Sequence, residues 1–325
     1  MDNQNLPLEL LRPIIEHLND DLPSLLAVSL VSSALRVEGQ RLLFRTMVLS
    51  KNVEVHIKFL SAVTSSTLLG HFVEEYHQVD LLDAEQKQEP LWGLTCRGLQ
   101  VMVNLKVLLF RALNGYPSAQ ILKECTFRLE VLKWECRDDA EQLYGFFLTQ
   151  TNLRILKVEW KGPGLNTSGI SPELRVLHGN RGTTNAFFPR RGITSLKWSP
   201  DREESPLLNG SIHHLSQEFH HIHFFSFGGP FGRPWLNIVI PHFQALEVLE
   251  LIGLNFHEVC SNPSLCLHFS LNTRPGASVA FRHPQATRVH PLQSNAPCLA
   301  RFIVTQVAQK VFSRIIYRVQ TSRTY

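Results

Sequence analysis

The amino-acid sequence predicts an α/β protein in which an N-terminal three-helix unit precedes a repeat solenoid with a curved parallel sheet. Apolar residues recur at helical spacing through residues 5–49. A pattern of apolar-x-x-apolar-x-apolar then recurs eight times within residues 72–258. The pattern stops after Glu258, and residues 259–325 contain no Asp or Glu. We therefore divide the chain into four parts, namely 5–49, a linking helix in 50–71, the solenoid in 72–258 and a poorly structured tail.

The first part contains three predicted helices, at about residues 7–18, 23–31 and 33–44. Pro7 suits a helix start, where the N–H that proline lacks would have no partner. Pro13 fits less well, because proline inside a helix removes one hydrogen bond, so the helix either starts near Glu9 or bends. One face of this helix is apolar, and its members are Leu10, Leu11, Ile14, Ile15 and Leu18. A fourth helix is expected at 52–65.

Each of the eight repeats predicts a short strand whose alternating side chains point into a core. The first positions of the pattern are separated by 19 to 29 residues, and they are Tyr76, Leu105, Leu129, Leu153, Leu174, Ile193, Ile222 and Leu246. In the first repeat the pattern reads Tyr76, Val79 and Leu81. Segments such as 119–125 and 139–149 are expected to be helical. One unit cannot bury its own apolar face, whereas stacked units can, with their strands side by side.

Composition limits the class of protein. We expect no signal peptide and no membrane span, because no long apolar run is present. The six cysteines are scattered without a C-x-x-C pair, which is typical of reduced thiols rather than of a disulfide or metal site. The chain is therefore expected in the cytoplasm, the nucleus or both.

Charge is distributed unevenly along the chain. Residues 1–258 have a net charge of −4, whereas residues 259–325 carry eight basic residues and a net charge of +8. Three interpretations of this tail remain open: a disordered basic segment, a divergent last repeat with a helix at 303–319, and sequence translated from a mis-assigned exon or shifted frame. We prefer the third. The main body gives no sign of nucleic-acid or membrane binding.

The N-terminal part resembles an F-box. The resemblance covers residues 5–49 and rests on Leu6-Pro7, on the segment 29–32 (Ser-Leu-Val-Ser) and on the aromatic Phe44 near its end. The repeats resemble an irregular leucine-rich-repeat solenoid, without the Asn that regular repeats carry after the strand. The resemblance implies a non-catalytic adaptor that binds Skp1, and through it a cullin, in a ubiquitin ligase. The implied Skp1-binding residues are Leu6, Pro7, Leu10, Ile14, Leu18, Leu26, Leu30 and Val31. For Leu10 and Ile14, packing between the three helices is an equal alternative.

The target protein is expected on the repeats. Trp134, Trp160 and Trp198 lie at or next to strand ends and are candidate exposed anchors, since Trp is frequent among residues that dominate binding energy. The alternative is that they fill gaps in an irregular core. We expect no metal and no cofactor. A group of histidines lacks a Cys or carboxylate pair at metal-ligand spacing and is expected on a solvated face, namely His213, His214, His220, His221 and His223.

Two other functions stay open. The chain could be a repeat scaffold without any ligase connection, whose first helices cap the end of the solenoid. It could also bind nucleic acid or a membrane surface through its basic tail, in which case binding should weaken steeply with salt.

Overall fold

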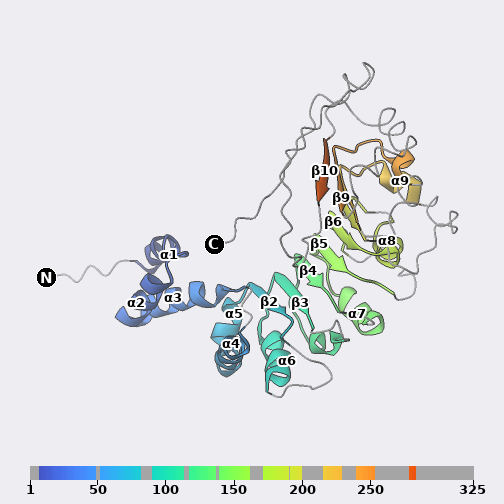
Figure 1. Cartoon of the computed structure of the whole chain (residues 1–325). Helices are drawn as coiled ribbons and strands as arrows, with labels where there is room; N and C mark the ends of the chain where they lie inside the picture. The colour runs from blue at the N-terminus through green and yellow to red at the C-terminus, as the bar shows by residue number, and fades with distance from the viewer. Residues whose placement is uncertain are drawn as a thin grey trace, which may run out of the picture. The chain divides into compact units, whose positions relative to one another are not determined.

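The computed structural model describes residues 7–48, 52–81, 90–112, 117–136, 139–161, 171–189, 191–199, 215–228, 239–252 and 278–282 (Figure 1). The chain divides into two compact units, residues 1–174 and 175–325. Each unit is an α/β structure in which strands alternate with helices and pair in parallel in chain order. The predicted fold class, N-terminal helices followed by repeated parallel β–α units, is confirmed.

The first unit begins with three packed helices, α1 (Leu8–Glu16), α2 (Leu22–Val31) and α3 (Ser33–Arg45). Their small core contains Ile15, Leu25 and Leu42. Side-chain caps fix the two helix starts that follow α1. Asp21 accepts a hydrogen bond from the backbone N–H of Ser24, and Ser32 accepts one from Leu35. Pro13 lies inside α1, which begins at Leu8.

The repeats of the first unit follow directly, because α3 runs into β1 (Thr46–Met47). The later strands are β2 (Glu75–Val79), β3 (Val107–Arg111), β4 (Val131–Trp134) and β5 (Ile155–Val158). The helical segments are α4 (Val53–Ser65), α5 (Thr67–Phe72), α6 (Leu91–Val101), the 3-10 helix η2 (Ala119–Leu122) and α7 (Ala140–Phe147). A buried row crosses the sheet in register, namely Tyr76, Leu108, Leu132 and Leu156.

The second unit has the same design. Its strands are β6 (Val176–Gly179), β7 (Ser195–Trp198), β8 (Phe224–Gly228), β9 (Val248–Ile252) and β10 (Ser278–Arg282). Its helical segments are α8 (Arg181–Phe187), α9 (Ser216–Phe219) and η5 (Ile240–His242). The corresponding buried row is Leu177, Leu196, Phe225 and Leu249. Because apolar side chains occupy equivalent positions in successive strands, each strand completes the core of its neighbour.

The register of the first predicted repeat is wrong. Tyr76 pairs with Leu108, which is the second position of its own repeat, so the buried side chains of this repeat are Val73, Tyr76 and Gln78. The pattern search missed this register because Gln78 is polar. The Gln78 side chain is nevertheless fully buried, and it accepts hydrogen bonds from the Tyr76 hydroxyl (2.6 Å) and the Thr95 hydroxyl (3.1 Å). Within the described residues its Nε2 has no hydrogen-bond partner, so only the acceptor oxygen of this polar side chain is satisfied in the core.

Part of the predicted tail is described. Ser278–Arg282 forms β10, which pairs in parallel with β9 and so continues the sheet by one strand. Of the three interpretations of residues 259–325, the divergent last repeat is the one in which a further strand is expected. The rest of 253–325, including the predicted helix at 303–319, lies outside the described residues.

Candidate protein-docking site

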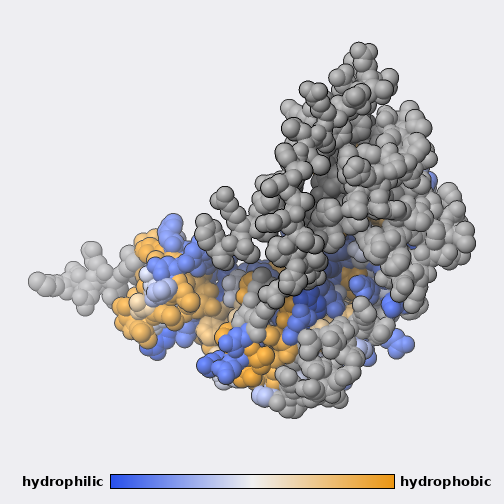
Figure 2. All heavy atoms as spheres, viewed as in Figure 1, coloured by the Kyte–Doolittle hydropathy of each residue, from blue (hydrophilic) through white to orange (hydrophobic). Residues whose placement is uncertain are grey.

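Apolar side chains are exposed on the first two helices. On α1 they are one turn apart, at Leu10 and Ile14, each about half exposed. On α2 they form a stripe spaced by four residues, Leu22, Leu26 and Leu30, with Leu30 79 % exposed. Val31 is exposed next to Leu30. Figure 2 shows apolar side chains gathered on the surface of the N-terminal helices. We call these six residues the N-terminal apolar face.

The opposite sides of the same helices form the local core. Ile15 on α1 and Leu25 on α2 are each 2 % exposed. The contact between α2 and α3 is close at Gly39, where an added Cβ would lie 2.2 Å from the Ser29 hydroxyl oxygen. Helix α2 is apolar almost all round, but only one of its sides is needed for packing on α3. A helix of this kind normally buries its whole circumference, so its open side is suited to a partner.

An ion-pair network holds α1 against α3. The Arg12 guanidinium donates to Glu38 at 3.2 Å, and Arg41 donates to Glu38 at 2.8 Å and to Glu16 at 3.0 Å. The hydrogen bond from Arg12 lowers the pKa of the Glu38 carboxyl, and Arg41 lowers it further, although burial opposes both. These ion pairs add to the apolar packing of Leu11, Ile15 and Leu18 in the three-helix core, of which Leu10 and Ile14 are not members.

The predicted Skp1-binding residues lie in three kinds of place. Leu10, Ile14, Leu26, Leu30 and Val31 are on the N-terminal apolar face, and Pro7 is exposed at the start of α1. Leu18 is only partly exposed and packs against the three-helix core. Leu6 lies outside the described residues. Sequence reasoning missed Leu22, although its spacing of four residues from Leu26 could have indicated it.

The three tryptophans are in the core. Trp134, Trp160 and Trp198 are at most 1 % exposed. Trp134 stacks on Phe110 with ring centroids 4.7 Å apart, Trp160 meets Phe147 edge-on, and Trp198 meets Phe227 edge-on. An exposed anchor needs an accessible ring, which these side chains lack. Their burial agrees with the alternative interpretation, in which large rings fill gaps in an irregular core.

The described histidines of the predicted group lie near the surface around a buried Ile222. His221 is exposed, and Nδ1 of His223 is 2.9 Å from a carboxylate oxygen of Glu247. His213 and His214 lie outside the described residues. Within the described ranges, no group of three or more His, Cys, Asp and Glu side chains could hold a metal ion.

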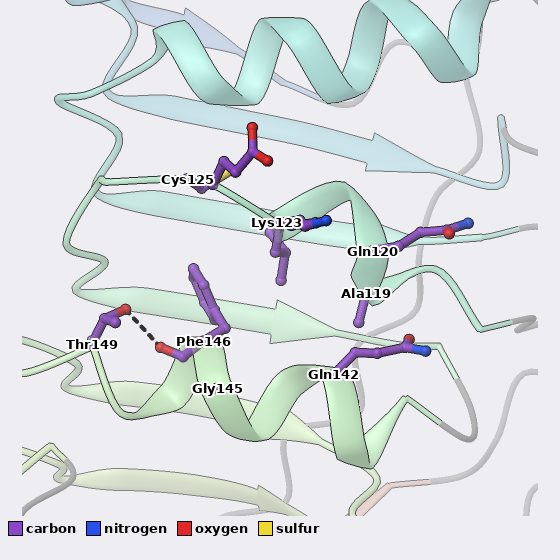
Figure 3. Close-up of a pocket in the computed structure, with 10 residues that line it drawn as sticks. Ala119, Gln120, Lys123, Cys125, Gln142, Gly145, Phe146 and Thr149 are labelled. Atoms are coloured by element: carbon purple, nitrogen blue, oxygen red, sulfur yellow. Dashed lines mark hydrogen bonds between the residues drawn. The ribbon is translucent and has the colours of Figure 1, made fainter.

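A groove lies between η2 and α7 (Figure 3). Its volume is about 390 Å³, and its lining includes Cys125, Gly145 and Phe146. Burial raises the pKa of the Cys125 thiol to about 12, and neighbouring Cys96 and Glu124 add to the rise. The thiol is therefore protonated near neutral pH and is a poor nucleophile. This groove offers a surface for contact rather than a reactive group.

No protein-family model matches the chain, and no curated protein matches it. None of the helices in the described part is long and apolar enough to cross a membrane.

Proposed function

We propose that this chain is the substrate-recognition adaptor of a Skp1–cullin–F-box ubiquitin ligase. In this proposal the N-terminal apolar face binds a Skp1-like protein, which connects the chain to a cullin, and the repeats hold the protein to be modified. The observation that carries the proposal is an exposed apolar face on a helical unit that already has a separate core of its own.

The size of this face supports a binding role. Leu26, Leu30 and Val31 are each more than half exposed on α2. Fully burying one such side chain contributes about 1.5–3 kcal/mol, so covering three of them would contribute several kcal/mol to an association. Scattered single apolar residues on a surface have no such significance, whereas a contiguous stripe does.

The proposed adaptor performs no bond chemistry. It would act by proximity, because holding a target near the ubiquitin-conjugating enzyme raises the effective concentration of the target's lysines. The direct run of α3 into β1 supports this role. The helical unit is thereby joined to the first strand without an intervening linker, so that a bound partner and the first repeats would keep a defined geometry.

The alternative is that the first helices only cap the solenoid. A cap is expected to bury its apolar face on the first repeat. In the first unit, α3 is the helix of the three that reaches α5 and β1, whereas the stripe on α2 is exposed. This arrangement favours a docking role for α2 over a purely capping one.

Co-purification of Skp1 with the full chain tests the proposal. The double substitution Leu26→Ser and Leu30→Ser should abolish recovery of Skp1, because it removes two apolar contacts from the stripe. The matched control is Leu148→Ser, since Leu148 is 53 % exposed directly after α7, outside the N-terminal apolar face. The control should recover Skp1 as the unaltered chain does. Equal recovery by the double variant and the control would refute the proposal.

A further inference from the structure

The sheet of the first unit has an outward face made by alternate side chains of β2 to β5. Side chains such as Leu108 and Leu132 point into the core, so Val107, Val131 and Ile155 at the preceding positions point outward. These three are paired in register and partly exposed, and Glu75 of β2 occupies the same row beside Val107. A parallel sheet normally has both faces covered. A partly exposed row of aliphatic side chains on such a sheet is therefore a candidate binding surface.

A second outward row runs beside the first. It contains His77, Leu109, Lys133 and Lys157, which are paired in register across the four strands. We call the two rows together the central strip. Lys133 is paired in register with Leu109 on β3 and with Lys157 on β5. The adjoining positions of the first row hold three aliphatic side chains, Val107, Val131 and Ile155.

Ion pairs border the central strip near both ends of the strands. Before the strands, Lys106 pairs with Glu74 (3.2 Å) and Arg154 pairs with Glu130 (3.6 Å). After them, Arg111 bridges Asp80 (2.5 Å) and Glu135 (3.1 Å), and Glu135 also pairs with Lys157 of the strip. Hydrogen bonds from Lys157 and Arg111 keep the pKa of the Glu135 carboxyl low, against the effect of its burial. These charges are therefore matched within the first unit.

Lys133 differs from the bordering charges. Among the described residues, Lys133 has no ion pair or side-chain hydrogen bond. Glu135, the residue directly after β4, is already engaged by two other cations. Lys133 also interacts electrostatically with His77, which lies two strands away in the same row, beyond Leu109. Burial lowers the pKa of His77 and Lys133 lowers it further, whereas Glu75, at 2.8 Å, raises it. Lys133 thus lies between aliphatic side chains and Lys157, whose own charge is already paired with Glu135.

We propose that the central strip binds an extended segment of a target protein that places an Asp or Glu carboxylate on Lys133 and aliphatic side chains on the adjoining row. Charge complementarity selects this occupant. A carboxylate at Lys133 would gain an ion pair partly shielded from water by Val131 and Leu109, which strengthens it relative to a fully exposed pair. The chain's own residues 259–325 contain no Asp or Glu side chain to take this place. This inference deepens the proposed function and rests on it in one respect, namely that the bound segment belongs to a protein to be modified.

Selection from a random 12-residue peptide display library on the full chain tests this inference. Enriched peptides should carry an Asp or Glu flanked by Val, Ile or Leu. Their affinities are then measured with fluorescein-labelled synthetic peptides by fluorescence anisotropy. Lys133→Glu should weaken binding at least tenfold, and the same variant should prefer a peptide in which the acidic residue is replaced by Lys. Lys123→Glu is the matched control, because Lys123 is exposed at the end of η2, and it should change binding less than twofold.

Either of two results from the selection would overturn the inference, and a third, from the peptide measurements, would contradict its chemistry. One is a selection that enriches no acidic-aliphatic peptide. The other is enrichment of peptides that bind the Lys133→Glu chain as tightly as the unaltered one. A peptide that binds better when phosphoserine replaces its acidic residue would also contradict the assignment to a carboxylate. Lys133→Gln, with circular dichroism on both variants, separates loss of charge from loss of fold. Co-purification of Skp1 is measured on the same preparations. Recovery of Skp1 without peptide binding would contradict this inference alone, whereas loss of Skp1 recovery by the unaltered chain would contradict the proposed function.

Discussion

Replacing Asp139 by alanine should lower the free energy of unfolding of the first unit by about 3–5 kcal/mol, because three buried donors lose their acceptor. The Asp139 carboxylate is 3 % exposed. It accepts hydrogen bonds from the backbone N–H of Ser118 (2.8 Å), the backbone N–H of Ala119 (2.9 Å) and the indole N–H of Trp134 (2.9 Å). One side chain thus connects β4, η2 and α7. Each orphaned buried donor costs about 1–3 kcal/mol, and the three effects are not independent.

The measurement is urea unfolding of the full chain followed by tryptophan fluorescence, to which Trp134 contributes directly. Asp139→Asn keeps the shape and one acceptor oxygen, so it should cost less than half as much as Asp139→Ala. Glu141→Ala is the control, because Glu141 is exposed in the first turn of α7, two residues after Asp139, and its replacement should change stability by no more than about 0.5 kcal/mol. A cost below 1 kcal/mol for Asp139→Ala, or equal costs for the Asn and Ala variants, would refute the assignment of Asp139 as the shared acceptor.

Three further predictions concern single side chains. Leu30→Ser should change stability by less than about 0.5 kcal/mol, whereas Leu25→Ala should cost about 2–5 kcal/mol, and thermal unfolding of both variants checks the orientation of α2. Gly145→Ala should stabilise by up to about 1 kcal/mol, because an added Cβ meets no atom within 4 Å; a loss of stability in urea would contradict this. Glu38→Gln should destabilise by about 1 kcal/mol at pH 7. The hydrogen bond from Arg12 lowers the pKa of Glu38 in the folded state. The ionised carboxylate therefore stabilises the folded state in full at pH values above the ordinary pKa of a glutamate. This difference should vanish as the pH falls through the folded-state pKa, and a difference that persists at pH 2 would refute it.

The strands could be predicted because their signal is redundant. In seven of the eight repeats, an apolar residue occupies each required inward position or a small residue replaces it, as Gly179 does in β6. The first repeat failed because Gln78 breaks the pattern, while its Oε1 accepts hydrogen bonds from Tyr76, two residues earlier on β2, and from Thr95 on α6. The two-residue strand β1 was missed because so short a segment carries no periodicity. Thr95 is 17 residues from Gln78 and comes close to it only after folding, so sequence spacing cannot reveal this partner.

The candidate site was predictable to a similar degree. Helical spacing identified the apolar stripes, but it could not say which apolar residues face the core. Leu25 and Leu26 are neighbours in the sequence, yet only Leu25 is buried, because α3 lies on its side of α2. The tryptophans at strand ends were equally ambiguous. Their burial depends on rings such as Phe110 and Phe147, which come from other repeats.

The central claim is that the N-terminal apolar face binds a Skp1-like protein. Isothermal titration of purified Skp1 into the full chain tests it most directly. We predict a one-to-one complex with a negative change in heat capacity, since apolar area is buried on binding. We also predict that the Leu26→Ser, Leu30→Ser variant gives no measurable heat of binding while Leu148→Ser binds normally. Absence of a complex with the unaltered chain, or unchanged affinity in the double variant, would contradict the account.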